Sequence, residues 1–176
     1  MAGDGPEDGW VEEVLKFWFE QTEPHLWFKE DPTLDATIQD RFLDLHENLV
    51  ARGNNGLLTD AQTPLAAVIV LDQMSRNMFR DTPRTFEADP QALQLAEAAI
   101  TQDLTPASPK TSVCFCIFPS SIQRIAKCKL PELQKWAEAH KAIVDRFGRF
   151  PHRNAILGRI STPEEIEFLK QPDSCL

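Results

Sequence analysis

The sequence predicts an all-α protein, built as an array of antiparallel helical hairpins in a single domain. Apolar residues recur at helical rather than alternating spacing, as at Ile38, Phe42, Leu45 and Leu49. Short turns rich in Pro, Asn, Asp and Gly separate the periodic segments, and helices with short connections pack as antiparallel neighbours. At 176 residues the chain is long enough for one substantial core and too short for two comfortable domains.

Helix starts are indicated by capping residues that precede prolines. Thr63-Pro64, Asp89-Pro90 and Thr162-Pro163 each place a capping side chain before a proline, whose missing N–H costs nothing at the first helical position. Thr162 and Glu165 also fit a capping box, in which each side chain accepts a hydrogen bond from the other residue's main chain. We therefore expect helices to begin at these three places.

Helix ends are indicated by turns and glycines. Gly53–Gly56 and Asp81–Pro83 are the clearest breaks, and Gly148 is expected to end a helix in a left-handed cap. We expect a disordered acidic N-terminus over residues 1–9, a helical domain over 10–170 and a tail over 171–176. In order along the chain, the expected helices are residues 10–20, 34–52, 64–80, 90–102, 131–147, 151–158 and 163–170.

Composition limits the classes of partner. Acidic residues outnumber basic ones, 27 to 18, which disfavours general binding to nucleic acids because these need a broad positive surface. The longest apolar run, Leu65–Leu71, is too short to span a bilayer, and the acidic start has no signal-peptide pattern. The four cysteines have neither zinc-site spacing nor disulfide density. We expect no metal, no cofactor and a cytoplasmic location.

Polar residues on an apolar helix face form the first candidate site. The apolar stripe of the helix from Thr63 continues through Asp72 and Arg76. These two residues are four apart and within reach of each other, and a partly buried carboxylate needs such a partner to offset its desolvation. Asn77 and Arg80 extend the polar patch by another turn. The patch is either a buried ion pair that fixes how helices dock or the cationic wall of a pocket.

The second candidate site is the cationic segment Arg146–Arg159, in a chain of formal net charge -9. Residues 141–159 contain five Lys or Arg and a single acid, Asp145. Because Pro151 suits a helix start, Phe150–Asn154 should lie at a helix N-terminus, whose free N–H groups favour anions. Arginine, histidine and asparagine side chains there can hold a carboxylate or phosphate. Alternatively, these arginines bind acidic side chains or helix C-terminal carbonyls elsewhere in the protein.

Structural ion pairs resemble functional sites, so the sequence leaves both interpretations open at each patch. No residue is assigned a catalytic role. The candidate ligand-binding residues are Trp27, Asp72, Arg76, Asn77, Arg80, Arg146, Arg149, His152, Arg153 and Asn154.

Long, ordered motifs connect the chain to a known family. They are Phe17–Phe19, Trp27-Phe28, Leu71–Arg80, Ala88–Pro90, Arg146–Asn154 and Leu157–Glu165. In these motifs the chain resembles the domain-of-unknown-function 924 family from about Val11 to Leu169, with one gap. The resemblance implies a tetratricopeptide-like right-handed helical array and no established activity.

The gap covers residues 113–130. Members of the family normally have a stretch similar to F-L-Y-L-P-F-E-H-S-E there, followed by Met-Gln or a similar pair. If the codons are translated one nucleotide earlier, residues 115–119 can spell L-L-Y-L-P and residues 120–124 can spell F-E-H-S-E. We therefore hypothesise that residues from about 112 to 130 are an out-of-frame translation, which makes Cys114, Cys116 and Cys128 accidents of the frame.

These observations favour a helical binding or scaffold protein with an arginine-rich pocket for a small anionic ligand or a peptide carboxylate, with a protein as a further kind of partner. One alternative is a hydrolase or transferase in intact relatives, in which the Glu and His residues of the missing motif transfer protons. The other is a purely structural polar cluster. Since this chain lacks the motif as written, its sequence leans against enzyme activity.

Overall fold

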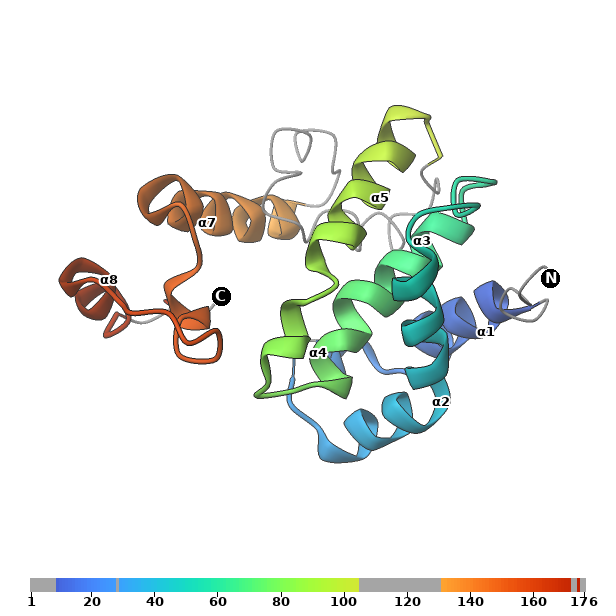
Figure 1. Cartoon of the computed structure of the whole chain (residues 1–176), viewed down its shortest axis with the longest axis horizontal. Coiled ribbons are helices and arrows are strands. Elements are labelled where there is room, and N and C mark those ends of the chain that lie inside the picture. The colour runs from blue at the N-terminus through green and yellow to red at the C-terminus, as the bar shows by residue number, and fades with distance from the viewer. Residues whose placement is uncertain (1–8, 28, 105–130, 172–173, 175–176) are drawn as a thin grey trace.

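The computed structural model describes residues 9–27, 29–104, 131–171 and 174. Within these residues every regular element is a helix, so the helical fold class is confirmed for the described part of the chain (Figure 1). The segment expected to be out of frame and the expected disorder of residues 1–8 lie outside the described residues. The domain limits and the handedness of the array stay predictions.

Helices α1 and α2 form the N-terminal part. α1 (Trp10–Lys16) continues into a π-helical turn, η1 (Phe17–Gln21), and a short 3₁₀ turn, η2 (Pro24–Leu26), leads on towards α2 (Pro32–Arg52). α2 begins two residues before its expected start because the Asp31 carboxylate accepts a hydrogen bond from the Leu34 N–H at 2.8 Å. It ends at Gly53, whose φ of 64° only glycine adopts easily.

The central helix comprises α3 (Thr63–Val68), η3 (Ile69–Met74) and α4 (Ser75–Met78), of which η3 is π-helical. The prediction that the Thr63 side chain caps this helix was wrong. The Asp60 carboxylate, not the Thr63 hydroxyl, accepts the free N–H groups of Gln62 and Thr63, at 2.7 and 2.8 Å. A residue three positions earlier in the turn therefore does the capping, and Thr63 becomes the first residue of the helix.

The remaining elements are η4 (Pro83–Phe86), α5 (Asp89–Thr101), α7 (Pro131–Phe147), η6 (Pro151–Arg153) and α8 (Pro163–Phe168). The predicted capping box before α8 is confirmed in both directions, as is the left-handed Gly148, with φ 68°. The predicted cap of α5 was wrong, because the Asp89 side chain makes no capping bond. The helix expected over 151–158 is a single 3₁₀ turn, and the chain reverses at Gly158, with φ 62°.

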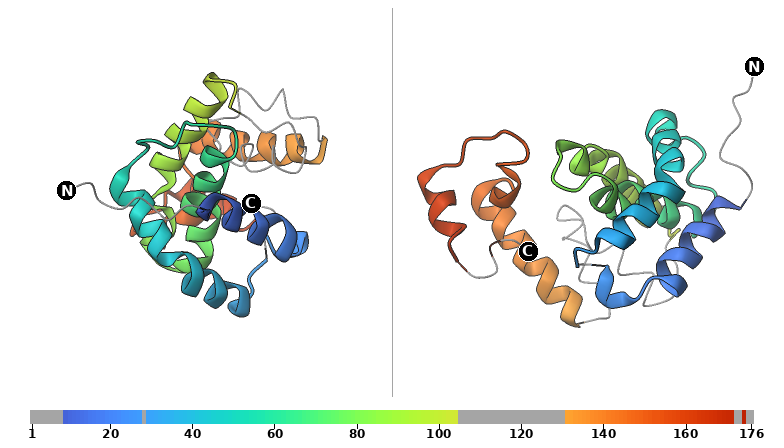
Figure 2. Two further views of the ribbon diagram at one scale, coloured as in Figure 1. Left: turned by 90° about the vertical axis from the view of Figure 1, so that its right-hand side faces the viewer. Right: turned by 90° about the horizontal axis from the view of Figure 1, so that it is seen from below.

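The core forms around the central helix. α2 packs on η3 and α4, α5 packs on α3 and η3, and α1 packs on α3. All residues from Pro64 to Ser75 are buried, and Trp18, Phe42 and Leu95 fill the space around them. The C-terminal helices α7 and α8 lie to one side of this bundle (Figures 1 and 2). None of the described helices is long and apolar enough to cross a membrane.

Candidate functional site

The Asp72 carboxylate of the central helix is enclosed in the core, with 1% of its side chain exposed. The Arg76 guanidinium lies 2.8 Å from Asp72 Oδ1 and also donates to the Asp72 main-chain oxygen at 2.7 Å. Gln73 Nε2 donates to the other carboxylate oxygen. The predicted pairing of Asp72 with Arg76 on one inward face is thereby confirmed.

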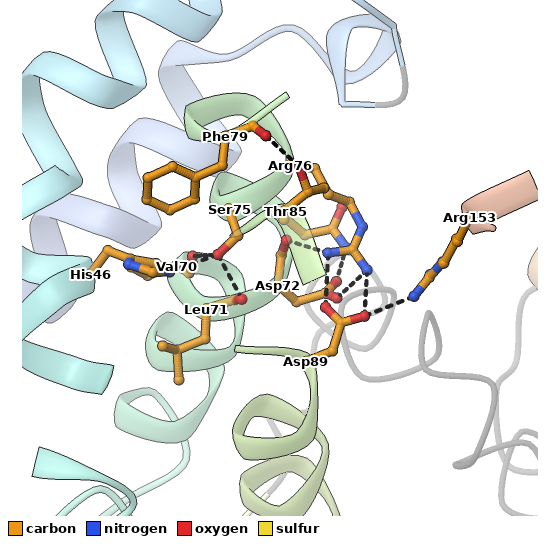
Figure 3. A network of polar contacts seen from close by, with 11 residues as sticks. His46, Val70, Leu71, Asp72, Ser75, Arg76, Phe79, Thr85, Asp89 and Arg153 are labelled. Atoms are coloured by element: carbon orange, nitrogen blue, oxygen red, sulfur yellow. Dashed lines mark hydrogen bonds and ion pairs between the residues drawn. The ribbon is translucent and has the colours of Figure 1, made fainter. Parts of the chain in front are cut away.

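A second carboxylate, from Asp89 at the start of α5, shares the same guanidinium. Arg76 Nη1 and Nη2 donate to the two Asp89 oxygens at 3.2 and 3.3 Å, and Arg153 Nη1 donates to Asp89 Oδ2 at 2.9 Å (Figure 3). We call Asp72, Arg76, Asp89 and Arg153 the polar network. It joins the central helix, α5 and η6 through two cations and two anions.

Burial and neighbouring charge shift the proton affinities of the network. Burial raises the pKa of the Asp72 carboxyl above its usual value, although the adjacent Arg76 acts in the opposite direction. Burial also disfavours the charge of Arg76, but the carboxylates of Asp72 and Asp89 outweigh it and raise the pKa of Arg76. The pKa of Arg153 is lowered by burial and by the positive charge of Arg76. Arg153 is thus the cation of the network whose positive charge is least compensated by the neighbouring carboxylates.

Two aromatic rings hold the Arg153 guanidinium. Its central carbon lies 4.2 Å from the centre of the Phe86 ring and 4.6 Å from that of Phe150. Arg76 lies over the same Phe86 ring at 5.5 Å. Such contacts are attractive and directional, so they fix where the guanidinium can donate hydrogen bonds.

A groove of about 580 Å³ opens beside the network, between η4 with the start of α5 and the segment 149–159. Apolar side chains line part of it, among them Phe86, Phe150 and Leu157. The charged residues that line it are Arg84, Glu87, Asp89, Arg149, Arg153 and Arg159. Four of these charged lining residues are cations and two are anions, in a chain that is negative as a whole.

Most of these arginines already have a carboxylate partner. Arg149 makes a two-bond contact with Glu165, at 2.6 and 2.8 Å, and Arg84 pairs with Glu47. The hydrogen bond from Arg149 lowers the pKa of Glu165 to about 2. Arg159 is exposed, and among the described residues no carboxylate is paired with it. Arg159 is therefore a cation of the groove that is available to a ligand.

Several predicted site residues lie elsewhere. Asn77 and Arg80 both bind Asp35, Asn77 at 2.7 Å and Arg80 at 2.7 and 2.8 Å. Trp27 stacks on Trp18 and donates its indole N–H to the Trp18 main-chain oxygen. These three side chains connect helices of the bundle and do not line the groove.

The rest of the cationic segment is divided among different contacts. Arg146 pairs with the exposed Glu164 at 2.8 Å, and the buried Asn154 donates to Ser161 and Glu165. His152 packs on Phe150 and is not part of the groove lining. The helix expected to begin near Pro151 is the three-residue turn η6, so free N–H groups of a long helix do not support an anion site over 150–154. Of the ten candidates, the structure brings together Asp72, Arg76 and Arg153, with Arg149 along the same groove.

Sequence reasoning missed the acidic partners Asp35, Asp89 and Glu165. Their sequence context predicts that Asp89 and Glu165 cap helices, and Glu165 does serve both its cap and Arg149. The available signal was the set of arginines at the two candidate sites, each of which needs a carboxylate partner if it is buried. In the described part of the chain, no group of three or more His, Cys, Asp or Glu side chains could hold a metal ion.

Comparisons with known proteins agree with the motifs. The family model described as bacterial protein of unknown function (DUF924) matches residues 14–173. A solved structure, of a protein of unknown function from Agrobacterium tumefaciens, is similar with a TM-score of 0.83 and 34% sequence identity. The alignment covers 92% of this chain and 97% of that one. No curated protein matches this chain.

Replacing Arg76 should be strongly destabilising, because it leaves the buried Asp72 carboxylate without its nearest cation. We expect Arg76→Met to lower the free energy of unfolding by about 3 to 5 kcal/mol, and Asp72→Leu in the same chain to recover much of that loss. Arg41→Met is a matched control, since the Arg41–Glu13 pair is exposed and worth at most about 1 kcal/mol. Urea titration measures the free energy of unfolding of the Arg76→Met and Arg41→Met variants. Equal losses in the two variants would show that the buried pair is not needed for stability.

Acidification should destabilise the fold through His152. Burial, followed by the positive charge of Arg153, lowers the pKa of His152 from 6.5 to about 4. Between these values the unfolded chain binds a proton that the folded chain does not, so stability falls as pH drops from 6.5 towards 4. After allowance for solvent screening, about 1 kcal/mol should be lost between pH 7 and pH 5.

The His152→Gln variant should not lose this free energy of unfolding between pH 7 and pH 5, since glutamine does not titrate. The background from His46, whose pKa is also lowered by burial, is present in both proteins and cancels. Urea titrations at the two pH values measure the difference, and proton NMR gives the His152 pKa directly. A His152 pKa of 6.5 or above in the folded protein would contradict this prediction.

Proposed function

Since the chain belongs to the DUF924 family of bacterial proteins of unknown function, we propose that it is a binding protein for a small oxyanion, either a phosphate group or the free carboxylate of a peptide. The ligand occupies the groove beside the polar network. The main support is the concentration of Arg149, Arg153 and Arg159 along one groove of a chain with net charge -9. A guanidinium matches both oxyanions because it donates two parallel hydrogen bonds.

The size and lining of the groove agree with a small ligand. Its volume of about 580 Å³ is in the range of small-molecule pockets, roughly 300 to 1,000 Å³. The apolar side chains of Phe150 and Leu157 provide a surface for the uncharged part of the ligand, and the arginines provide its anchor. The same combination suits a peptide C-terminus, whose last side chain would lie on the apolar part.

The proposal extends to the domain limits, the helical array and the cellular location that the sequence predicts. We place the groove on a single helical domain over about residues 10–170, in a tetratricopeptide-like right-handed array that acts in the cytoplasm. Helical arrays commonly present concave binding surfaces, which is an argument from fold and not from the site. The protein recognises its partner by charge and performs no chemistry on it.

Ligand binding should depend on Arg159. Isothermal titration with inorganic phosphate, and with a short peptide that has a free C-terminal carboxylate, should show binding, and the amidated peptide should bind much more weakly. Arg159→Gln should weaken binding by about tenfold or more, the value of one charge-assisted hydrogen bond. The loss should leave thermal stability unchanged, because Arg159 is exposed and has no carboxylate partner among the described residues.

Arg52→Gln is the matched control for this test. It removes the same charge from a residue that does not line the groove and whose guanidinium donates to the Asn55 main-chain oxygen. It should bind both probes as the unmodified chain does. If neither probe binds, or if the two variants behave alike, the polar cluster is structural and the proposed function is wrong.

We also propose that residues from about 112 to 130 are translated out of frame. Sequencing of the gene and its transcript should give codons for residues 113–129 that spell the family motif one base earlier. Peptide mass mapping of the natural protein should then find the motif peptides in place of the Cys114 and Cys128 peptides. Codons that cannot spell the motif in that frame would contradict the hypothesis.

A further inference from the structure

The Asp89 carboxylate occupies the position in the groove where two guanidinium groups meet. It accepts hydrogen bonds from Arg153 at 2.9 Å and from Arg76 at 3.2 and 3.3 Å. This is the arrangement that arginine pairs form with a bound carboxylate or phosphate. We infer that Asp89 is an internal competitor, which fills the oxyanion position between Arg76 and Arg153 until an external oxyanion displaces it. This inference rests on the proposed function, because it concerns the same groove.

Of the two carboxylates in the network, Asp89 is the one that can leave. Its side chain is 22% exposed and lines the groove, whereas that of Asp72 is 1% exposed and held by Gln73 as well as Arg76. Although Asp89 begins α5, its side chain makes no capping bond, so its departure would not expose free N–H groups of the helix. Within the described residues, the two arginines are its hydrogen-bonding partners.

The two arginines respond differently to this exchange. Arg76 keeps the Asp72 carboxylate at 2.8 Å and the Asp72 main-chain oxygen at 2.7 Å. Arg153 loses its ion-pair partner among the described residues and stays oriented by the rings of Phe86 and Phe150. The position that Asp89 leaves is therefore a preformed cationic one, centred on Arg153.

Charge balance within the polar network favours the exchange. Two carboxylates and two guanidinium groups make the ionised network neutral, so a bound anion with Asp89 still in place would leave a partly buried excess of negative charge. A dianion gains more from Arg149 and Arg159 nearby than a monocarboxylate does, whereas Asp89 competes with a single charge. The groove should thus prefer a phosphate group to a monocarboxylate.

Competition of this kind lowers the apparent affinity of the groove for its ligand. The intrinsic affinity is multiplied by the fraction of time for which the position is free. If Asp89 occupies it for about nine-tenths of the time or more, removing its charge should tighten binding by about tenfold or more. Asp89→Asn has nearly the shape of the native residue and no charge. Glu87→Gln is the matched control, since Glu87 lines the same groove and is paired with Arg84 at 3.9 Å, outside the polar network.

The test is isothermal titration of the full chain with inorganic phosphate and with acetate. We expect Asp89→Asn to bind phosphate at least about tenfold more tightly than the unmodified chain, Glu87→Gln to differ by less than about threefold, and phosphate to bind more tightly than acetate. Arg153→Gln added to Asp89→Asn should abolish the gain. If the unmodified chain binds phosphate and Asp89→Asn binds it no better, the inference is wrong and the proposed function stands. If no variant binds phosphate, the inference is wrong, and if none binds the peptide with a free C-terminal carboxylate either, the proposed function is wrong as well.

A second measurement applies even if Asp89→Asn fails to fold. A crystal structure of the unmodified chain with saturating phosphate should show phosphate oxygens on Arg153 and the Asp89 carboxylate turned away. Phosphate bound elsewhere in the groove, with the Asp89–Arg153 pair intact, would overturn the inference.

Discussion

The buried carboxylate of Asp72 is the constraint around which the polar part of the structure is arranged. A charge enclosed in a core is tolerated only with a close counter-charge and hydrogen bonds to its remaining oxygens. Arg76 meets this need from the next turn of the same helix, but its guanidinium has further donors. Asp89 accepts two of them, and Arg153 then completes the charge balance. One buried charge thereby links the central helix to α5 and to η6 (Figure 3).

The π-helical turn η3 belongs to the same arrangement. A π-turn leaves main-chain groups without ideal partners, and such turns are frequent at functional sites. Ser75 donates its hydroxyl to the Leu71 oxygen at 2.8 Å, so its oxygen must accept from His46 Nε2, also at 2.8 Å. Burial lowers the pKa of His46, which favours the neutral imidazole, here with its proton on Nε2. The irregular turn is stabilised from one side by α2 and from the other by the polar network.

Local features of this structure could be predicted from the sequence, and remote ones could not. The capping box of Thr162 and Glu165 and the pairing of Asp72 with Arg76 depend on residues three or four apart, so helical spacing alone predicts them. Asp89 bonds to Arg153, 64 residues away, through an approach that only the folded chain defines. The prediction that Thr63 caps the central helix was wrong for a related reason: the Asp60 carboxylate also lies within reach of the free N–H groups, and only the folded turn decides which side chain accepts them.

The abundance of acids explains why the structural and functional interpretations are compatible. Since 27 acids surround 18 bases, almost any arginine that points inward finds a carboxylate, and pairing alone does not distinguish a scaffold from a site. A binding site differs from a purely structural contact in that an external anion can replace its carboxylate. The Asp72–Arg76 contact lies in the core, where an external anion cannot replace it, whereas the Asp89–Arg153 contact lines an open groove. The buried half of the network thus stabilises the central helix, whereas the exposed half, the Asp89–Arg153 contact, joins the C-terminal segment to α5 at the place where we propose that a ligand binds.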